Sequence, residues 1–219
     1  IRIEQIKCIK SRGFGHIGGA LSATDLIAAL YGSVMKYDPK NPKWPDRDRF
    51  VCSKGHAGPA VYAALSLKGF FPSEWLLTLN RPGTRLPSHC DMNLTPGIDM
   101  TTGSLGQGAS AAAGMALALK LNKSDARVYL LLGDGECNEG QVWEMALFAA
   151  SKKINNLIAF VDYNHKQLDG RTEDIIDLGD LKSKFETFGW HTQSVDGQDP
   201  DAIVEAINRA KEEQGDRPA

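Results

Sequence analysis

Two short stretches carry oxygen-bearing side chains that could bind a metal ion. In "GDGECNEG" (133–140), Asp134 comes directly after an apolar run, and in "VDYN" (161–164), Asn164 ends the next apolar run. The carboxyl ends of neighbouring parallel strands meet at one edge of a sheet, so these two side chains can lie close together. Mg²⁺ prefers oxygen ligands and completes its shell with phosphate and water. A hairpin turn is the alternative for this Asp-Gly pair, but the residues that follow are helical in pattern, which favours the metal site.

Three histidines form a second group of candidates, because each lies beside glycine or in an irregular loop. His16 lies in "RGFGHIGG" (12–19), His56 in "SKGHAG" and His89 in "LPSH". Glycine allows a ligand to approach closely, and an imidazole near neutral pH can serve as acid, base or hydrogen-bond donor. A single histidine is more often structural than functional, but this shared setting favours a common site. We expect surface or structural roles for His165 and His191, which lie outside these stretches.

The glycines around His16 have the G-x-G-x-x-G spacing of a dinucleotide-binding loop, at Gly13, Gly15 and Gly18. Such a loop must follow a buried strand. Residues 1–10 instead carry isoleucines at roughly helical spacing, with charged residues between them. A helix C-cap and a turn explain the first two glycines better. A nicotinamide-dependent oxidoreductase is therefore a distant alternative.

Composition and charge exclude several classes of protein. The chain has 219 residues, of which 42% are hydrophobic, enough for one domain with a buried core. A net charge of −2 gives no basic surface for nucleic acid or for a membrane anchor, and no apolar run approaches the roughly 20 residues of a membrane-spanning helix. Four cysteines without a C-x-x-C pair predict reduced thiols and a cytoplasmic location. Cys90 follows His89, but adjacent loop residues rarely face each other, so we expect no Cys-His nucleophile.

Apolar runs alternate with segments of helical periodicity, which predicts the elements that position these residues. The expected strands are 50–53, 127–133, 157–163 and 190–197. The expected helices are 22–35, 57–68, 139–151 and 200–213, with another one after the glycine-rich turn 101–108. The alternation predicts an α/β fold with a mainly parallel sheet and helices on both faces. The long irregular stretch 81–97 is of a length that usually has a function.

Several stretches together resemble the N-terminal half of transketolase. "GDGE…NEG" followed by Asn164 resembles the thiamine diphosphate motif of transketolase-like enzymes. Five further blocks match in the family's order: "GFGHIGGALS", "SKGHAGPAVYAAL", "LPSH", "TTGSLGQG" and "DLKSKFETFGW". The resemblance covers nearly the whole chain and is strongest to the N-terminal subunit of transketolases split into two polypeptides. It implies a thiamine diphosphate-binding fold, with residues 1–219 as a single pyrophosphate-binding domain cut at both ends.

The resemblance also implies which residues hold thiamine diphosphate and its metal ion. Asp134, Asn164 and the backbone carbonyl of Lys166 would ligate Mg²⁺, with Ca²⁺ as the alternative ion. A helix that opens with glycine amides suits the diphosphate anion. The residues expected to contact the cofactor are His56, Gly103, Ser104, Leu105, Asp134, Gly135, Glu136 and Asn164.

Catalytic and interface roles come from the same resemblance. His16 would contact the hydroxyls of the donor sugar, and His56 the diphosphate side of the cofactor. His89 would act near the carbonyl carbon, as a donor to the developing alkoxide or as a proton shuttle. Glu139 matches an acidic residue that links two active sites across the family's dimer interface. The alternative for Glu139 is a solvated glutamate favoured by the helix dipole.

Some parts of the family's active site are missing from the chain. They are the pyrimidine-binding domain with its activating glutamate, the arginines that read the sugar phosphate, a further histidine and a "T-x-K-G"-like segment. The resemblance therefore implies a C-terminal partner subunit, with pyrimidine-binding and C-terminal domains, in a dimer of heterodimers. The expected partners also include sugar phosphates, but no nucleic acid or membrane.

The predicted function is to transfer a two-carbon ketol unit from a ketose phosphate to an aldose phosphate, together with the partner subunit. Two alternatives are a subunit of a deoxyxylulose-phosphate synthase and the first component of a 2-oxo-acid dehydrogenase. His56 in "SKGHAG" and the "GSLGQG" stretch are both closer to transketolase. A third alternative is a non-catalytic paralogue, against which the intact metal-binding and histidine positions argue.

Overall fold

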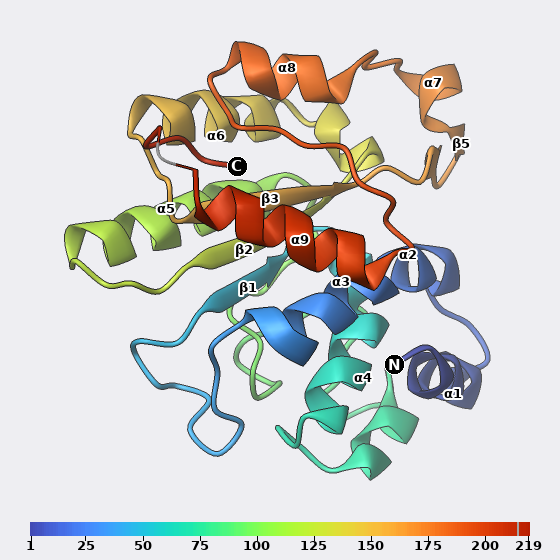
Figure 1. The fold of residues 1–219 in the computed structure, drawn as a ribbon. Coiled ribbons are helices and arrows are strands. Elements are labelled where there is room, and N and C mark those ends of the chain that lie inside the picture. Colours follow the sequence, from blue (N-terminus) through green and yellow to red (C-terminus); the bar gives the residue numbers. More distant parts are fainter. Residues whose placement is uncertain (214) are drawn as a thin grey trace.

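A parallel three-stranded sheet lies at the centre of the computed structural model, which describes residues 1–213 and 215–219 (Figure 1). The sheet has the order β1-β2-β3, with β1 (Arg49–Cys52), β2 (Val128–Gly133) and β3 (Leu157–Asp162). After β3, a small antiparallel pair forms from β4 (Lys166–Gln167) and β5 (Gly170–Arg171). Parallel pairing confirms the predicted class of sheet.

Helices and short helical turns make up most of the remaining structure. They are, in chain order, α1 (Arg2–Arg12), α2 (Ile17–Ser22), α3 (Thr24–Ala29), η1 (Leu30–Val34), η2 (Gly55–Ala57), α4 (Gly58–Leu67), η3 (Ser73–Thr78), α5 (Gln107–Leu121), η4 (Gly135–Asn138), α6 (Gly140–Ser151), α7 (Thr172–Ile175), α8 (Leu181–Thr187) and α9 (Pro200–Lys211).

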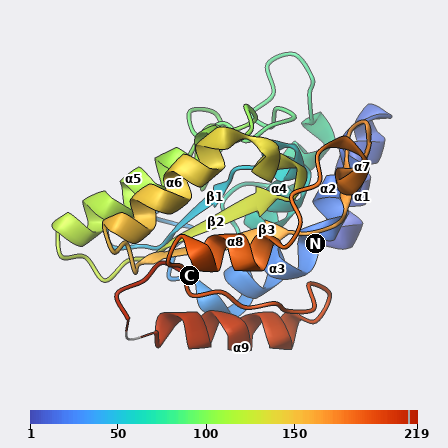
Figure 2. The ribbon, with the colours of Figure 1, turned by 90° about the horizontal axis from the view of Figure 1, so that it is seen from above.

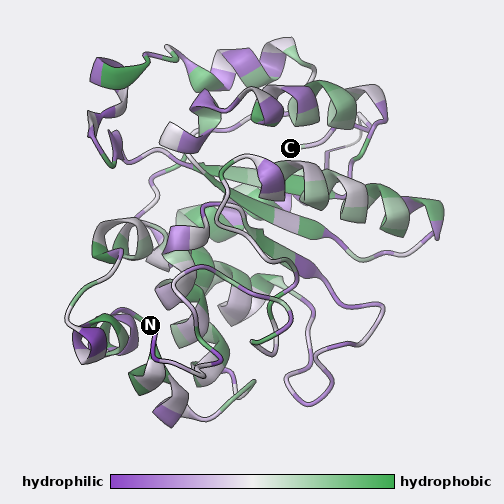
Figure 3. Cartoon of the chain, turned by 180° about the vertical axis from the view of Figure 1, so that it is seen from behind, coloured by the Kyte–Doolittle hydropathy of each residue, from purple (hydrophilic) through white to green (hydrophobic). Residues whose placement is uncertain are grey.

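Alternate side chains of β2 enter two separate hydrophobic clusters. Tyr129 and Leu131 pack on the face covered by α3, α4 and α9. Val128, Leu130 and Leu132 pack on the face covered by α5, α6 and α8. Figures 1 and 2 show the sheet between these helical layers, and Figure 3 shows that its strands are mainly apolar. An apolar strand without polar alternation is buried on both faces, as the sequence predicts.

Most expected elements are present within a few residues of their predicted bounds. The expected helix 22–35 begins as α3 and continues as η1, a π-helical turn. The glycine-rich stretch follows α1, and Gly13 caps that helix in the left-handed conformation at φ 85°. Its N–H donates to the carbonyl oxygens of Ile9 and Lys10. The helix-end interpretation of the G-x-G-x-x-G pattern is thus confirmed.

The predicted strand 190–197 is wrong. The N–H of His191 donates to the carbonyl of Pro218 at 2.9 Å, and Ala219 bonds in turn to the backbone of β3. Residues 218–219 therefore lie between β3 and this segment, so no strand ladder joins the two in the part of the chain that the structure describes. A cavity of about 690 Å³ extends along the edge of β3, between α9 and the segment 190–198.

The four cysteines are buried free thiols. Cys90 is 2% exposed and packs in the core on the side of α4, whereas the ring of the adjacent His89 lies against the backbone at Gly103. The two side chains point in different directions, as expected for neighbours in a loop. Among the described residues, none of the helices has the length and apolar character needed to cross a membrane.

Leu130 provides a test of the buried central strand. Because Leu130 is 0% exposed, we expect Leu130→Ala to lower the free energy of unfolding by about 2–5 kcal/mol, measured by urea denaturation. Leu168, between β4 and β5, is 97% exposed, and Leu168→Ala should change stability by no more than about 0.5 kcal/mol. Equal effects of the two substitutions would contradict the two-sided burial of β2.

Candidate active site

The ends of all three parallel strands meet at one edge of the sheet. Lys54 follows β1, Asp134 follows β2, and Asp162 is the last residue of β3. The N–H of Asp134 donates to the carbonyl of Asp162 at 3.3 Å, which extends the pairing of the strands into this edge. Ligands of α/β sheets bind beyond such carboxyl ends. The structure therefore places the predicted metal-binding aspartate where a site is expected.

The carboxylate of Asp134 is 2% exposed and is held by uncharged donors. Oδ1 accepts the N–H of Gly135 at 2.9 Å, while Oδ2 accepts the N–H of His165 at 2.7 Å and the hydroxyl of Thr172 at 3.5 Å. Burial raises the pKa of Asp134, and the two backbone donors oppose that rise. Asp134 forms no ion pair with another described residue. A buried carboxylate without a cation partner fits a metal ion.

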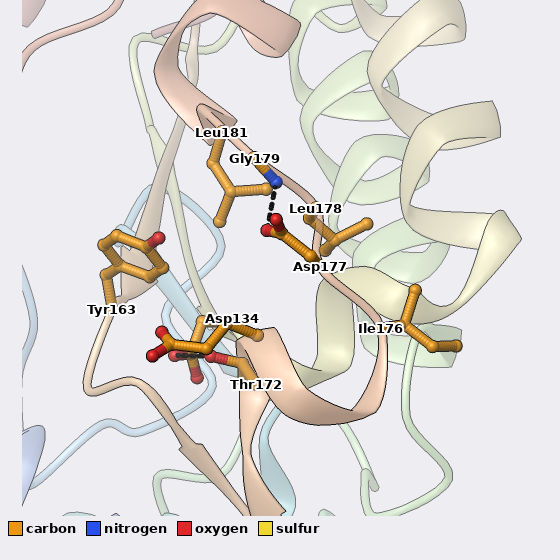
Figure 4. Close-up of a pocket in the computed structure, with 9 residues that line it drawn as sticks. Asp134, Tyr163, Thr172, Ile176, Asp177, Leu178, Gly179 and Leu181 are labelled. Carbon is orange, nitrogen blue, oxygen red and sulfur yellow. Dashed lines mark hydrogen bonds between the residues drawn. The ribbon is translucent and has the colours of Figure 1, made fainter.

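A small pocket of about 40 Å³ opens beside Asp134, between β3 and the segment before α8. Figure 4 shows Asp134 and Thr172 side by side, with Tyr163 next to them. On the far side, Asp177 accepts the N–H of Gly179 at 2.8 Å. This volume holds a few water molecules. It is too small to accommodate a sugar phosphate.

The other predicted metal ligands lie on the segment that is tied to Asp134 through His165. Asn164 Oδ1 accepts the N–H of Lys166 at 3.0 Å, and its Nδ2 donates to the hydroxyl of Ser22 at 3.3 Å. His165 has a left-handed backbone at φ 61°, which turns the chain here. Among the described residues, no group of three His, Cys, Asp or Glu side chains could hold a metal ion. The predicted metal ligands differ from such a cluster, because they combine the carboxylate of Asp134, the side-chain amide of Asn164 and the backbone carbonyl of Lys166.

Lys54 is a site residue that the sequence analysis missed. Its side chain is 1% exposed, and Nζ forms an ion pair with Asp162 Oδ2 at 2.6 Å. The hydroxyl of Ser22 donates to the same oxygen at 2.6 Å. Lys54 was missed because a lysine in a turn after a strand usually lies in solvent, and because its partner Asp162 is 108 residues further along the chain. Its position between a buried strand and the candidate His56 was a sequence signal that pointed to the site.

The structure brings the three candidate histidines together. The ring centroid of His16, the N-cap of α2, lies 5.7 Å from that of His56 and 5.4 Å from that of His89. Two glycines leave room for these rings. A Cβ on Gly19 would lie 2.6 Å from Cδ2 of His56, and a Cβ on Gly103 would lie 2.9 Å from Cγ of His89. The predicted cluster is thus present.

The environment of His56 and His89 favours their neutral forms. Burial, followed by the positive charge of Lys54 and the neighbouring imidazoles, lowers the pKa of His56 to about 4. Burial and the neighbouring His16 lower the pKa of His89. A neutral imidazole both donates and accepts a hydrogen bond. At physiological pH, His56 and His89 are therefore suited to contact hydroxyl groups.

The glycine-rich turn before α5 lies against the strand ends. Thr102 is bonded to the backbone of β1 and of Cys90. Gly103 and Gly106 then take φ angles of 139° and 81°, which glycine readily adopts. Between them, Ser104 is exposed and Leu105 is half-buried.

The three remaining predicted residues lie just after β2. A Cβ on Gly135 would lie 2.9 Å from Cβ of Gln167, so no larger residue fits there. Glu136 is buried, with its carboxylate hydrogen-bonded within the protein. Glu139 is exposed at the N-cap of α6.

The fold and this edge define a class of α/β domain with a charged site at the ends of parallel strands. The model of the transketolase thiamine diphosphate binding domain matches residues 1–219. The crystal structure of transketolase from Campylobacter jejuni superposes with a TM-score of 0.93 at 31% identity, over 99% of this chain and 35% of that one. A Pichia stipitis transketolase in complex with sedoheptulose 7-phosphate gives a TM-score of 0.93 at 33% identity, over 99% of this chain and 34% of the other.

Curated relatives include proteins described as transketolase subunits. The 6-deoxy-6-sulfo-D-fructose transketolase subunit SqwG of a Clostridium species is 57% identical over 98% of this chain and 78% of its own length. An apulose-4-phosphate transketolase subunit of Phocaeicola vulgatus is 40% identical over 87% of this chain and 67% of its own length. The chain belongs to the transketolase family, as its thiamine diphosphate binding domain. The predicted resemblance, fold class and transketolase function are thereby confirmed.

The pKa of His56 can be measured directly. We expect its Cε1 proton in NMR spectra to titrate at about pH 4, below the ordinary 6.5. Between pH 4 and 6.5, His56 binds more protons in the unfolded chain than in the folded one. The contribution of neutral His56 to the free energy of unfolding is therefore complete above pH 6.5 and is lost as the pH falls toward 4. Lys54→Gln should raise the pKa of His56. A wild-type midpoint at 6.5 or above would contradict the buried, Lys54-facing placement.

Proposed function

We propose that the chain is the pyrophosphate-binding subunit of a two-subunit transketolase. In this proposal it transfers a two-carbon ketol unit from a ketose phosphate to an aldose phosphate, and it needs a separate pyrimidine-binding subunit. The observation that carries the proposal is the buried Asp134 carboxylate, which forms no ion pair among the described residues. It lies at the same edge of the sheet as the end of β1, where the glycine-rich turn is hydrogen-bonded and which His56 follows. This combination suits a metal-bound diphosphate with a polar substrate beside it.

Asp134, Asn164 and the carbonyl of Lys166 would hold a Mg²⁺ ion, or Ca²⁺ in its place. Oxygen ligands of this kind fit a hard cation that shares its shell with phosphate. Gly103, Ser104, Leu105 and Gly135 would contact the diphosphate, where the glycines allow close approach of the backbone. When bound, thiamine diphosphate supplies the nucleophilic carbon of the reaction, while the protein orients it and moves protons.

The histidines would serve the substrate side of the site. His16 is exposed at the N-cap of α2, where the hydroxyls of a donor sugar can reach it. His56 would face the diphosphate, and His89, over Gly103, would give a proton to the oxygen on the reacting carbon. The lowered pKa of His89 supports a group that can both donate and accept at neutral pH.

Support for a partner comes from relatives that are described as transketolase subunits. The chain spans 78% of the SqwG subunit and 34% of the human transketolase. In the proposal the partner supplies the pyrimidine-binding and C-terminal domains, and two such pairs form a dimer of heterodimers. Glu139, exposed at the start of α6, would lie at the interface between the two active sites.

The relative at 57% identity is named for 6-deoxy-6-sulfo-D-fructose. We therefore propose this ketose as a donor to test beside fructose 6-phosphate, with ribose 5-phosphate as acceptor. The assay follows ketol transfer by the chain with Mg²⁺ and thiamine diphosphate, with and without its candidate partner. Activity is expected only with the partner. Activity of the chain alone would contradict the two-subunit proposal, and cofactor binding without turnover of any donor would favour a non-catalytic paralogue.

Asp134→Asn tests the metal site with little change of shape. We expect the Mg²⁺-dependent affinity for thiamine diphosphate to fall by about 100-fold or more, because even outer partners of metal ligands typically change affinity about 10- to 100-fold. Isothermal titration of the complex with its partner measures this change. Asp177→Asn is the matched control, since Asp177 lines the same pocket but accepts the N–H of Gly179 and is not a predicted metal ligand. Unchanged affinity of Asp134→Asn would remove Asp134 from the metal site.

His16→Ala tests the substrate side. We expect kcat/KM for the donor sugar to fall by about tenfold, as for the loss of a hydrogen bond to substrate, with little change in the dissociation constant of thiamine diphosphate. His191→Ala is the control, because His191 lies beside Glu213 at 3.1 Å, away from the cluster. Equal losses of sugar use and cofactor affinity would mean that His16 has been assigned to the wrong ligand.

A further inference from the structure

The carboxylate of Glu136 joins three segments at the edge of the sheet where the strands end. Oε1 accepts the hydroxyl of Ser53, just after β1, and the N–H of Gly106 at 2.8 Å, just before α5. Oε2 accepts the N–H of Gly133, the last residue of β2, at 3.1 Å. The residue is 2% exposed. A single buried side chain thus links the ends of two strands to the start of the helix that follows the glycine-rich turn.

The three donors occupy both oxygens of Glu136. Each donor is uncharged, and burial raises the pKa of this carboxyl while the hydrogen bonds lower it. A carboxylate accepts hydrogen bonds and donates none, so its two oxygens match three converging donors. Because both oxygens are engaged within the protein, the side chain is arranged to hold backbone rather than to reach a ligand.

The glycine-rich turn is anchored at its two ends, and Glu136 supplies one of the anchors. At the first end, Thr102 donates its hydroxyl to the carbonyl of Cys52 at 2.7 Å and its N–H to the carbonyl of Cys90 at 3.0 Å. At the second end, the N–H of Gly106 donates to Glu136. Residues 103–105, the proposed diphosphate contacts, lie between these anchors. Removing the second anchor leaves the turn fixed at one end only.

We propose that Glu136 is a positioning residue, which holds the turn 103–106 in the conformation that binds the cofactor's diphosphate and does not itself contact the cofactor. This inference rests on the proposed function of the turn. A loop ordered before binding loses less conformational entropy when the ligand arrives, so pre-organisation increases affinity. The sequence suggested direct contact for Glu136, whereas the hydrogen bonds favour an action through Gly106.

Glu136→Met and Glu136→Gln distinguish the effect of losing the hydrogen bonds from the effect of changing the volume of the side chain. Methionine has similar volume but no acceptor for Gly106, whereas glutamine retains one oxygen. In the complex with the partner and saturating Mg²⁺, we expect Glu136→Met to weaken thiamine diphosphate binding by about tenfold. Glu136→Gln should recover part of that loss, because its oxygen can accept the N–H of Gly106 while its amide nitrogen cannot accept the N–H of Gly133. Inorganic pyrophosphate with Mg²⁺, as a second probe, should show the same order because it reports on the diphosphate site alone.

Gln5→Met is the matched control for a buried polar group. Gln5 is 0% exposed and donates to the hydroxyl of Thr24 at 2.8 Å, away from the turn. Gln5→Met should lower stability but leave cofactor affinity unchanged. If the loss of any buried polar group weakened cofactor binding, Gln5→Met would weaken it as well. If Glu136→Met binds thiamine diphosphate as tightly as the wild type, the inference is overturned. If the wild-type complex itself does not bind the cofactor, the proposed function has failed instead.

Amide hydrogen exchange provides a measurement that needs no variant. In the cofactor-free wild type, the N–H of Gly106 should exchange slowly because it is bonded to a buried carboxylate, while the N–H of the exposed Ser104 exchanges faster. NMR of the labelled protein resolves the two amides. Fast exchange at Gly106 would show that the turn is not held before binding and would overturn the inference even if Glu136→Met did not fold.

Discussion

The parallel pairing of β2 with a strand on each side is the constraint on which the site depends. Because the strands run in the same direction, the residues after them meet at one edge despite their distance along the chain. The register pairs Gly133 with Asp162, so Asp134 emerges directly beside the end of β3. Every residue of β2 is buried between two helical layers, which holds the strand ends at a common level. The geometry of the site is therefore a consequence of the packing of the core.

The buried charges at this edge have different partners, and these differences separate their roles. Asp162 forms an ion pair with Lys54 and also accepts the hydroxyl of Ser22. Glu136 accepts three uncharged donors that belong to the surrounding backbone and Ser53. Asp134 also receives uncharged donors, but it faces a pocket rather than packed backbone. A buried carboxylate is costly without adequate partners, so Asp134 is the member of the set best suited to a bound cation.

Patterns within a few residues predicted most of the elements, whereas contacts between distant segments decided what was missed. The apolar run at β2 and the glycine at the end of α1 have local causes, burial on both faces and a left-handed helix cap. The segment 190–197 has a strand-like composition, but its neighbour is the backbone at 218–219, and composition does not specify pairing. The role of Lys54 likewise depends on a partner on another strand. His16 and His56 were found because an adjacent glycine was a local signal of close approach, and His89 was found because it lies in a long irregular stretch.

The site has a charged half at the strand ends and a second half formed by the imidazoles, and Lys54 connects the two. Its ammonium is paired with Asp162 and, after burial, is the next cause that lowers the pKa of His56. The glycines set where the rings lie, since a side chain at Gly19 or Gly103 would occupy their positions. A neutral ring held in place can exchange a proton with a hydroxyl, while a charged ring next to the ammonium would be repelled. The glycines near His16 thus contribute to the chemistry of the site through the placement of the rings.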